Sequence, residues 1–214
     1  AADYIGGFPE HPHRGFETIT YMKAGRMRHR DHMGNEGVIG AGDVQWMTAG
    51  AGVLHSEMPE QEQGLLHGFQ IWLNLPAAEK MKPAAYRDIA NAEITKQRLT
   101  AGGSVRVIAG DVAVNGQHIA GVMPKLTTEP VLIDVQLSAN ETVELSFKAE
   151  NPALIYVYNG NVYQGGVDEG DVLQGNGQQG KSDLLKQRQL GIYSSGDRFH
   201  LEAGPSGAEL LILS

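Results

Sequence analysis

Two short runs of histidine and carboxylate residues stand out in the first third of the chain. One contains His11 and His13, and the other contains His55 and Glu57. Because alternate residues of a strand share a face, each pair places two side chains ~6.5 Å apart on one side of a strand. Two antiparallel strands that bring these faces together would surround one ion with three imidazoles and one carboxylate and leave positions open. The spacing therefore predicts a metal centre at these four residues.

The residue types also indicate which metal to expect. The chain has no cysteine, so thiolate ligands, disulfides and iron–sulfur clusters are excluded. Imidazole and carboxylate ligands favour a first-row transition metal over Ca²⁺ or Mg²⁺, and open positions suit redox-active iron better than structural zinc. We therefore expect Fe²⁺ or Fe³⁺, with another divalent transition metal as the alternative.

The other histidines carry weaker signals. His29 and His32 have a spacing that suits a metal, but a solvated hairpin loop explains it better. His118 and His200 are expected at ordinary structural positions.

The elements that must position the metal ligands are strands. The 28 glycines are spread between short apolar runs, and helical periodicity is weak, with one short candidate at 77–81. Residues 143–147 alternate between apolar and polar, which is typical of a strand with one buried face. Asn-Gly pairs at 115–116 and 159–160 predict type I′ hairpins. Many short strands with regular turns predict an all-β barrel or sandwich.

The chain is expected to contain two domains. The apolar alternation lapses between Pro83 and Gly103, which predicts domains at residues 1–95 and 96–214. Both halves contain a tyrosine four residues before a glycine, followed later by a Gly-Asp pair. This recurring pattern indicates an internal duplication. We align the two halves by matching Gly25 with Gly160 and Asp43 with Asp197. The residues of the second half that then correspond to the four ligands do not form a metal-binding set, so that domain is expected to lack the metal site. The residues that align with the four ligands are Ser146, Lys148, Glu209 and Leu211.

Two long motifs strongly resemble the pirin family of the cupin superfamily. They are GFPEHPHRGFETITYM and GDVQWMTAGAGVLHSEMPEQEQGLLHGFQIWLNLP, and the similarity is dense over residues 1–90 and thin beyond. The resemblance implies a bicupin, that is, two jelly-roll β-barrel domains packed together, with one iron in the N-terminal barrel held by His11, His13, His55 and Glu57. It also implies that the chain is a truncated form of a longer protein.

The resemblance further implies quercetin 2,3-dioxygenase activity. In that reaction the 3-hydroxyl of a flavonol is deprotonated, its oxygen binds the metal, and O₂ cleaves the central ring with release of CO. Glu57 is the expected proton acceptor. Glu17, which serves as a ligand in the general cupin motif, is expected beside the metal as the second choice. Four residues are expected to form either a flat wall for the flavonol or plain barrel core: Phe16, Trp46, Met47 and Phe69.

Two other functions use the same ligands. One is a non-enzymatic, redox-sensitive iron-binding regulator that binds a transcription factor or a metabolic enzyme, and the other is a cupin whose metal serves folding alone. A net charge of −8 disfavours direct binding of nucleic acid. No apolar run reaches the ~18 residues of a membrane helix, and the first residues lack the features of an export signal. We therefore expect a cytoplasmic protein.

Overall fold

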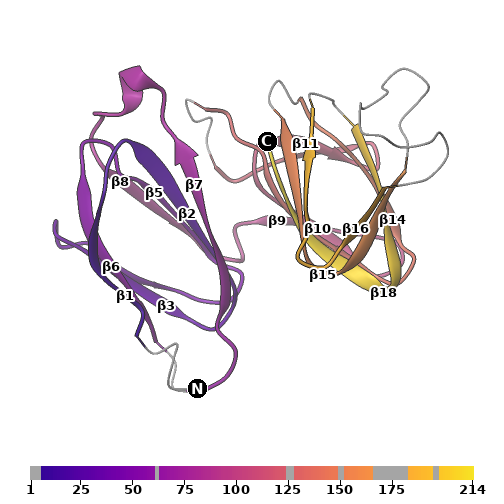
Figure 1. Cartoon of the computed structure of the whole chain (residues 1–214), viewed down its shortest axis with the longest axis horizontal. Helices are drawn as coiled ribbons and strands as arrows, with labels where there is room; N and C mark the ends of the chain where they lie inside the picture. The colour runs from indigo at the N-terminus through magenta and orange to yellow at the C-terminus, as the bar shows by residue number, and fades with distance from the viewer. Residues whose placement is uncertain (1–5, 61–62, 124–127, 149–151, 166–182, 195–197) are drawn as a thin grey trace. The chain divides into compact units, whose positions relative to one another are not determined.

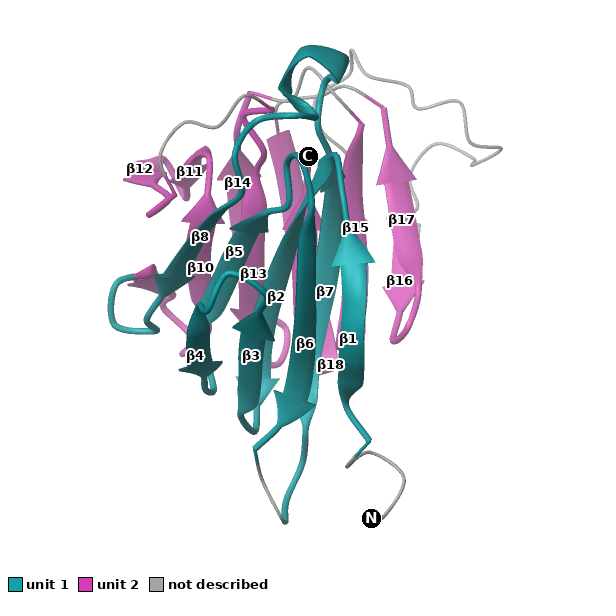
Figure 2. Cartoon of the chain, turned by 90° about the vertical axis from the view of Figure 1, so that its left-hand side faces the viewer, with its two compact units in different colours: residues 1–93 teal, residues 94–214 magenta. Residues whose placement is uncertain are grey.

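The computed structural model of the chain describes residues 6–60, 63–123, 128–148, 152–165, 183–194 and 198–214. These residues form antiparallel strands and one short 3-10 helix, η2 (Ala77–Glu79). They divide into two compact units, residues 1–93 and 94–214 (Figure 1 and Figure 2). The expectation of an all-β protein with two domains is confirmed. No helix in the described part of the chain is long and apolar enough to cross a membrane.

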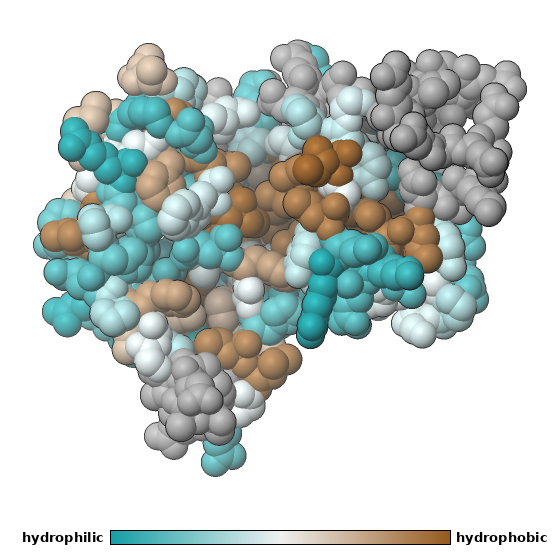
Figure 3. Space-filling view, in the orientation of Figure 1, coloured by the Kyte–Doolittle hydropathy of each residue, from teal (hydrophilic) through white to brown (hydrophobic). Residues whose placement is uncertain are grey.

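The N-terminal unit contains two four-stranded sheets that enclose a common interior. In strand order, the first sheet is β1 (Phe8–His13), β6 (Val53–Pro59), β3 (Met27–Asp31) and β4 (Glu36–Ile39). The second sheet is β7 (His67–Asn74), β2 (Phe16–Ala24), β5 (Val44–Thr48) and β8 (Ala85–Ile89). Hydrogen bonds and ring contacts join side chains of the two sheets inside. On the outside, hydrophilic residues cover much of the visible surface of this unit (Figure 3).

A single strand through residues 11–17 would place Glu17 on the same face as His11 and His13, but the chain turns between them. β1 ends at His13 and β2 begins at Phe16. Between them Gly15 has a φ of 76°, a left-handed conformation that glycine adopts without steric cost. Because of this turn, the inward and outward alternation of side chains in β2 does not continue that of β1. Glu17 therefore does not lie on the inner face with His11 and His13.

The C-terminal unit is a nearly closed barrel built around the long strand β18 (Arg198–Leu213). This strand pairs with β13 (Leu132–Leu137), β14 (Thr142–Ser146) and β15 (Ala153–Gly165). The remaining strands are β9 (Thr95–Arg98), β10 (Ser104–Ala109), β11 (Asp111–Val114), β12 (Gln117–Ala120), β16 (Asp183–Lys186) and β17 (Leu190–Tyr193). Buried aliphatic and aromatic side chains fill its interior.

One of the two predicted hairpins is confirmed. Asn115 and Gly116 both have positive φ and connect β11 to β12, as a type I′ turn requires. The prediction at 159–160 is wrong, because β15 runs on through these residues and continues to pair with β18 across two register shifts. Gly160 has a φ of 69°, so it forms a bulge within the strand instead of a turn.

Candidate metal centre

Three histidines converge inside the N-terminal unit. β1 pairs antiparallel with β6 so that His11 lies opposite His55, and His13 lies opposite Val53. The alternation along both strands therefore directs all three imidazoles inward. Their candidate ligand atoms lie within 4.8 Å of one another, and their ring centroids are 4.6 to 4.8 Å apart. The first three of the four predicted ligands are thus brought together.

The hydrogen bonding of these rings fits a metal ion. His11 Nδ1 donates to the carbonyl oxygen of Pro9 at 2.8 Å, which leaves the lone pair of Nε2 directed at His55 Nε2, 3.1 Å away. His13 Nε2 and His55 Nδ1 are buried and find no hydrogen-bond partner among the described residues. Buried polar atoms without a partner are costly, and coordination of an ion would relieve that cost at His13 Nε2. The donor set therefore fits a divalent transition metal.

The protonation state of the rings fits a metal as well. Burial, followed by the neighbouring His55 and His11, lowers the pKa of His13 to about 4. Burial likewise lowers the pKa of His55 to about 4, with His11 as the next cause. Both rings are consequently neutral near pH 7, which is the form that donates a lone pair to a metal.

These pKa shifts predict how the metal-free protein responds to acid. Between pH 6.5 and about 4 the unfolded chain binds protons at both histidines that the folded chain does not bind. The free energy of unfolding is therefore expected to fall as the pH falls through this window. Thermal melting of chelator-treated protein across the window measures the slope. His55→Gln should flatten the slope, whereas the matched change His118→Gln, at an exposed residue of β12, should leave it intact. Equal slopes in the two variants would contradict the assignment.

Glu57 lies on the same inner face of β6 as His55, but its carboxylate is held by other groups. Thr20 Oγ1 donates to Oε1 at 3.1 Å, and Gln70 Nε2 donates to Oε2 at 2.7 Å. The side chain is buried, with 3% exposure. The group of mutually close ligand atoms consists of the three histidines, and Glu57 is a neighbour of this group.

Glu17 is placed on the opposite face of β2 from Thr20. It is buried, and it accepts hydrogen bonds from Thr48 Oγ1 at 2.6 Å and Trp46 Nε1 at 3.2 Å. Lys82 Nζ lies 3.9 Å from its Oε1. These contacts occupy the carboxylate away from the histidines.

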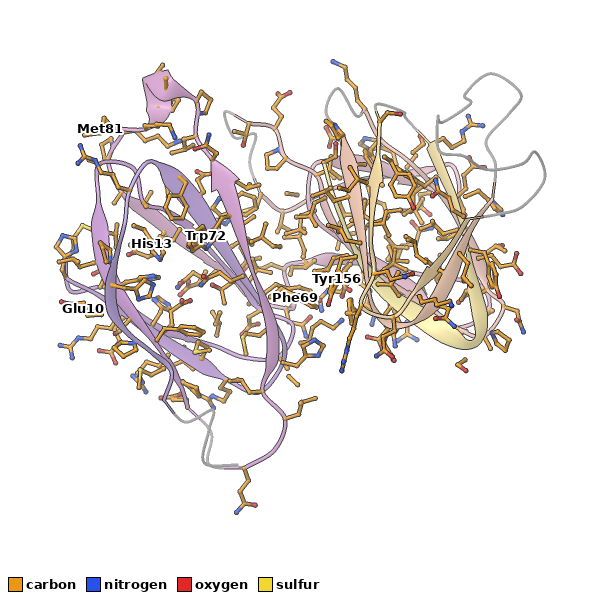
Figure 4. All side chains as sticks on the ribbon, viewed as in Figure 1. Glu10, His13, Phe69, Trp72, Met81 and Tyr156 are labelled. Carbon is orange, nitrogen blue, oxygen red and sulfur yellow. The ribbon has the colours of Figure 1, made fainter. Side chains whose placement is uncertain are left out.

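The four predicted wall residues separate into different places. Phe16 packs edge-on against His13, with ring centroids 5.0 Å apart. Met47 is fully buried on the inner face of β5, whereas Trp46 points to the other face, where Glu17 lies. Phe69 projects from the side of β7 opposite to Trp72 (Figure 4).

Trp72 is an aromatic neighbour of the histidines that the sequence analysis did not select. Its ring centroid lies 4.9 Å from that of Phe16 and 5.5 Å from that of His13, and the residue is still 62% exposed. Figure 4 shows Trp72 and His13 directed toward each other inside the N-terminal unit. The period-2 alternation of HGFQIWLN, which places Gln70 and Trp72 on one face, is the signal that identifies this face.

The remaining histidines lie apart from the cluster. His29 is buried on the inner face of β3, with Nε2 3.3 Å from Asp88 Oδ2, while His32 is exposed in the following turn and accepts from the Leu54 backbone N–H. The two rings therefore do not converge on one ion. His118 and His200 are exposed on β12 and β18.

The structure describes all four residues of the second unit that align with the predicted ligands. One of the two residues of that unit used to make the alignment is not described. Asp197 lies outside the described residues. Ser146 ends β14, Lys148 is exposed, Leu211 is buried, and Glu209 accepts from Asn159 Nδ2 at 3.3 Å.

The close pairing of His29 with Asp88 depends on the absence of a side chain at Gly37 on β4. A Cβ there would lie 2.5 Å from His29 Nε2 and 2.8 Å from Asp88 Oδ2. We expect Gly37→Ala to lower the free energy of unfolding by about 1–3 kcal/mol, as overpacking of a filled interior does. Thermal or chemical denaturation checks this result. Gly6→Ala, where a Cβ meets nothing within 4 Å, is the control, and an equal loss in both variants would refute the explanation.

The fold and the site together define a class of protein. An antiparallel barrel with a histidine cluster on its inner face, followed by a second β-barrel unit, is the architecture of a bicupin. The sequence profile of the family described as Pirin matches residues 1–73. The crystal structure of quercetin 2,3-dioxygenase from Acinetobacter baumannii superposes with a TM-score of 0.82 at 32% identity, covering 97% of this chain and 67% of that one. The chain belongs to the pirin family.

Curated relatives agree with this assignment. A Pseudomonas aeruginosa protein with the provisional name quercetin 2,3-dioxygenase is 48% identical over 160 residues, which is 75% of this chain and 56% of that protein. A pirin-like protein of Caulobacter vibrioides is 46% identical over 162 residues, or 76% of this chain and 58% of that protein. The chain thus spans little more than half the length of these relatives.

Proposed function

We propose that this chain carries the metal-dependent centre of a flavonol dioxygenase of the quercetin 2,3-dioxygenase type. The observation that carries the proposal is the convergence of three imidazoles beside an exposed aromatic ring, Trp72. The name of the Acinetobacter baumannii neighbour supports the choice of substrate. Flavonol and O₂ are then the substrates.

Four residues would hold the ion: His11, His13, His55 and Glu57. Iron is the proposed metal, since imidazole and carboxylate ligands with open positions suit it, and other divalent transition metals suit the same donors. When bound, it supplies redox chemistry with O₂ and a Lewis-acid site for the flavonol oxygen.

The side chains of this site would orient the substrate and move its proton. The flat ring of a flavonol would stack on the exposed face of Trp72, and Phe16 packs against the indole ring. Glu57 would accept the proton of the 3-hydroxyl, and the donors Thr20 and Gln70 hold its two oxygens in place.

Metal analysis joined to an aerobic quercetin-consumption assay tests this function. After iron is added back, we expect about one iron per chain and loss of quercetin that depends on O₂. Chelator-treated protein and an anaerobic reaction are the controls. Iron without turnover would refute the enzyme and favour the redox-sensitive regulator that binds a protein partner. Turnover in chelated protein would refute a metal-dependent reaction.

A further inference from the structure

A chain of hydrogen bonds links the exposed ring of Trp72 to the buried carboxylate of Glu57. Trp72 Nε1 donates to Gln70 Oε1 at 3.1 Å, and Gln70 Nε2 donates to Glu57 Oε2 at 2.7 Å. On the other side of the carboxylate, Thr20 Oγ1 donates to Oε1. Gln70 is therefore the connection between the solvent-exposed aromatic ring and the carboxylate next to the histidines.

The direction of these hydrogen bonds allows a single orientation of the Gln70 amide. An indole N–H can only donate, so it requires the amide oxygen. The amide nitrogen then faces Glu57, where it meets a carboxylate oxygen that accepts. The flipped amide would place its nitrogen against the indole N–H and its oxygen against the carboxylate, which loses both hydrogen bonds.

The Trp72 ring is held in place although it is exposed. Its ring lies at 38° to that of Phe16 and at 77° to that of His13, and Gln70 accepts from its nitrogen. β7 and β1 are edge strands of their sheets, so the ring stands beside an open edge of the unit. A planar ligand that reaches the histidines along this edge meets the ring of Trp72.

We propose that Gln70 is a positioning residue that couples the Trp72 ring to the placement of the Glu57 carboxylate. The inference rests on the proposed function and adds the residue that connects ligand stacking to the metal centre. A flat aromatic ligand that tilts the indole moves the N–H group that donates to the Gln70 amide oxygen. The amide then moves with it, and its N–H group shifts the Glu57 carboxylate. The Glu57 carboxylate is both a proposed metal ligand and the proposed proton acceptor, so loss of the link changes both metal affinity and turnover.

Ni²⁺ binding to chelator-treated protein tests the link without any catalytic activity. The variants are Gln70→Leu, which removes both hydrogen bonds, Trp72→Phe, which keeps an aromatic face but removes the N–H, and the double variant. We expect Gln70→Leu to weaken Ni²⁺ binding by about tenfold, the usual effect of losing a partner of a metal ligand. Trp72→Phe should weaken it by less, and it should add nothing when Gln70 is already Leu. Gln117→Leu, at an exposed residue of β12, is the control and should bind as the unchanged protein does.

Steady-state kinetics with quercetin provides the second readout. Gln70→Leu should lower kcat by about tenfold and leave KM within about twofold, because the stacking surface of Trp72 remains. The link would be overturned if Trp72→Phe weakened Ni²⁺ binding as much in the Gln70→Leu background as it does alone. The ring would then act directly through His13. Ni²⁺ affinity equal to that of the unchanged protein in Gln70→Leu would overturn the positioning role alone. Failure of the unchanged protein to bind Ni²⁺ would overturn both this inference and the proposed function.

Discussion

His55→Ala is expected to abolish stoichiometric iron binding. His55 stands opposite His11 across the β1–β6 pair, and its ring centroid lies 4.6 Å from that of His11 and 4.8 Å from that of His13. Its loss leaves two imidazoles that belong to one strand, and it removes the imidazole donor of the facing strand. We expect the iron content to fall from about one per chain to less than about one tenth. Elemental analysis of protein reconstituted with iron and freed of excess metal measures this change.

His118→Ala is the matched control for this variant. His118 is exposed on β12 in the other compact unit, so its removal should leave the iron content unchanged. Melting curves of the chelator-treated proteins show whether His55→Ala still folds. Equal iron content in the two variants would refute the assignment of the centre to the histidine cluster.

Glu57→Gln is expected to lower quercetin turnover by more than about tenfold. Glutamine has nearly the same shape, so it fits between Thr20 and Gln70, but its amide cannot take up the proton of the 3-hydroxyl. It also replaces the anionic oxygen of a proposed metal ligand with a neutral one. Measuring kcat and iron content on the same sample separates a lost proton acceptor from a lost ligand.

Glu10→Gln is the control for the carboxylate. Glu10 is exposed near the start of β1 and projects away from the interior, so turnover should be unchanged (Figure 4). Full activity in Glu57→Gln would refute its role as proton acceptor. Glu17 would not inherit that role readily, because its oxygens are held by Thr48 and Trp46 on the opposite face of β2.

Local patterns in the sequence were sufficient for several features of this protein. Alternation predicted the buried face of β14, and the Asn-Gly pair at 115–116 predicted its hairpin. The spacing of His11 with His13 indicated inward-facing pairs, because the side-chain period of a strand depends on nothing outside the strand. The two long motifs also sufficed to identify the family.

Other features depend on contacts between distant residues, which no local pattern encodes. The left-handed Gly15 between β1 and β2 moved Glu17 to the opposite face, and the bulge at Gly160 replaced a predicted hairpin with continued pairing to β18. Trp72 reaches His13 only because β7 and β1 are edge strands of sheets that enclose one interior. Strand periodicity is set within a few residues, so it is readable from sequence, whereas strand partners and the sense of a glycine turn are decided by the packing of the whole unit.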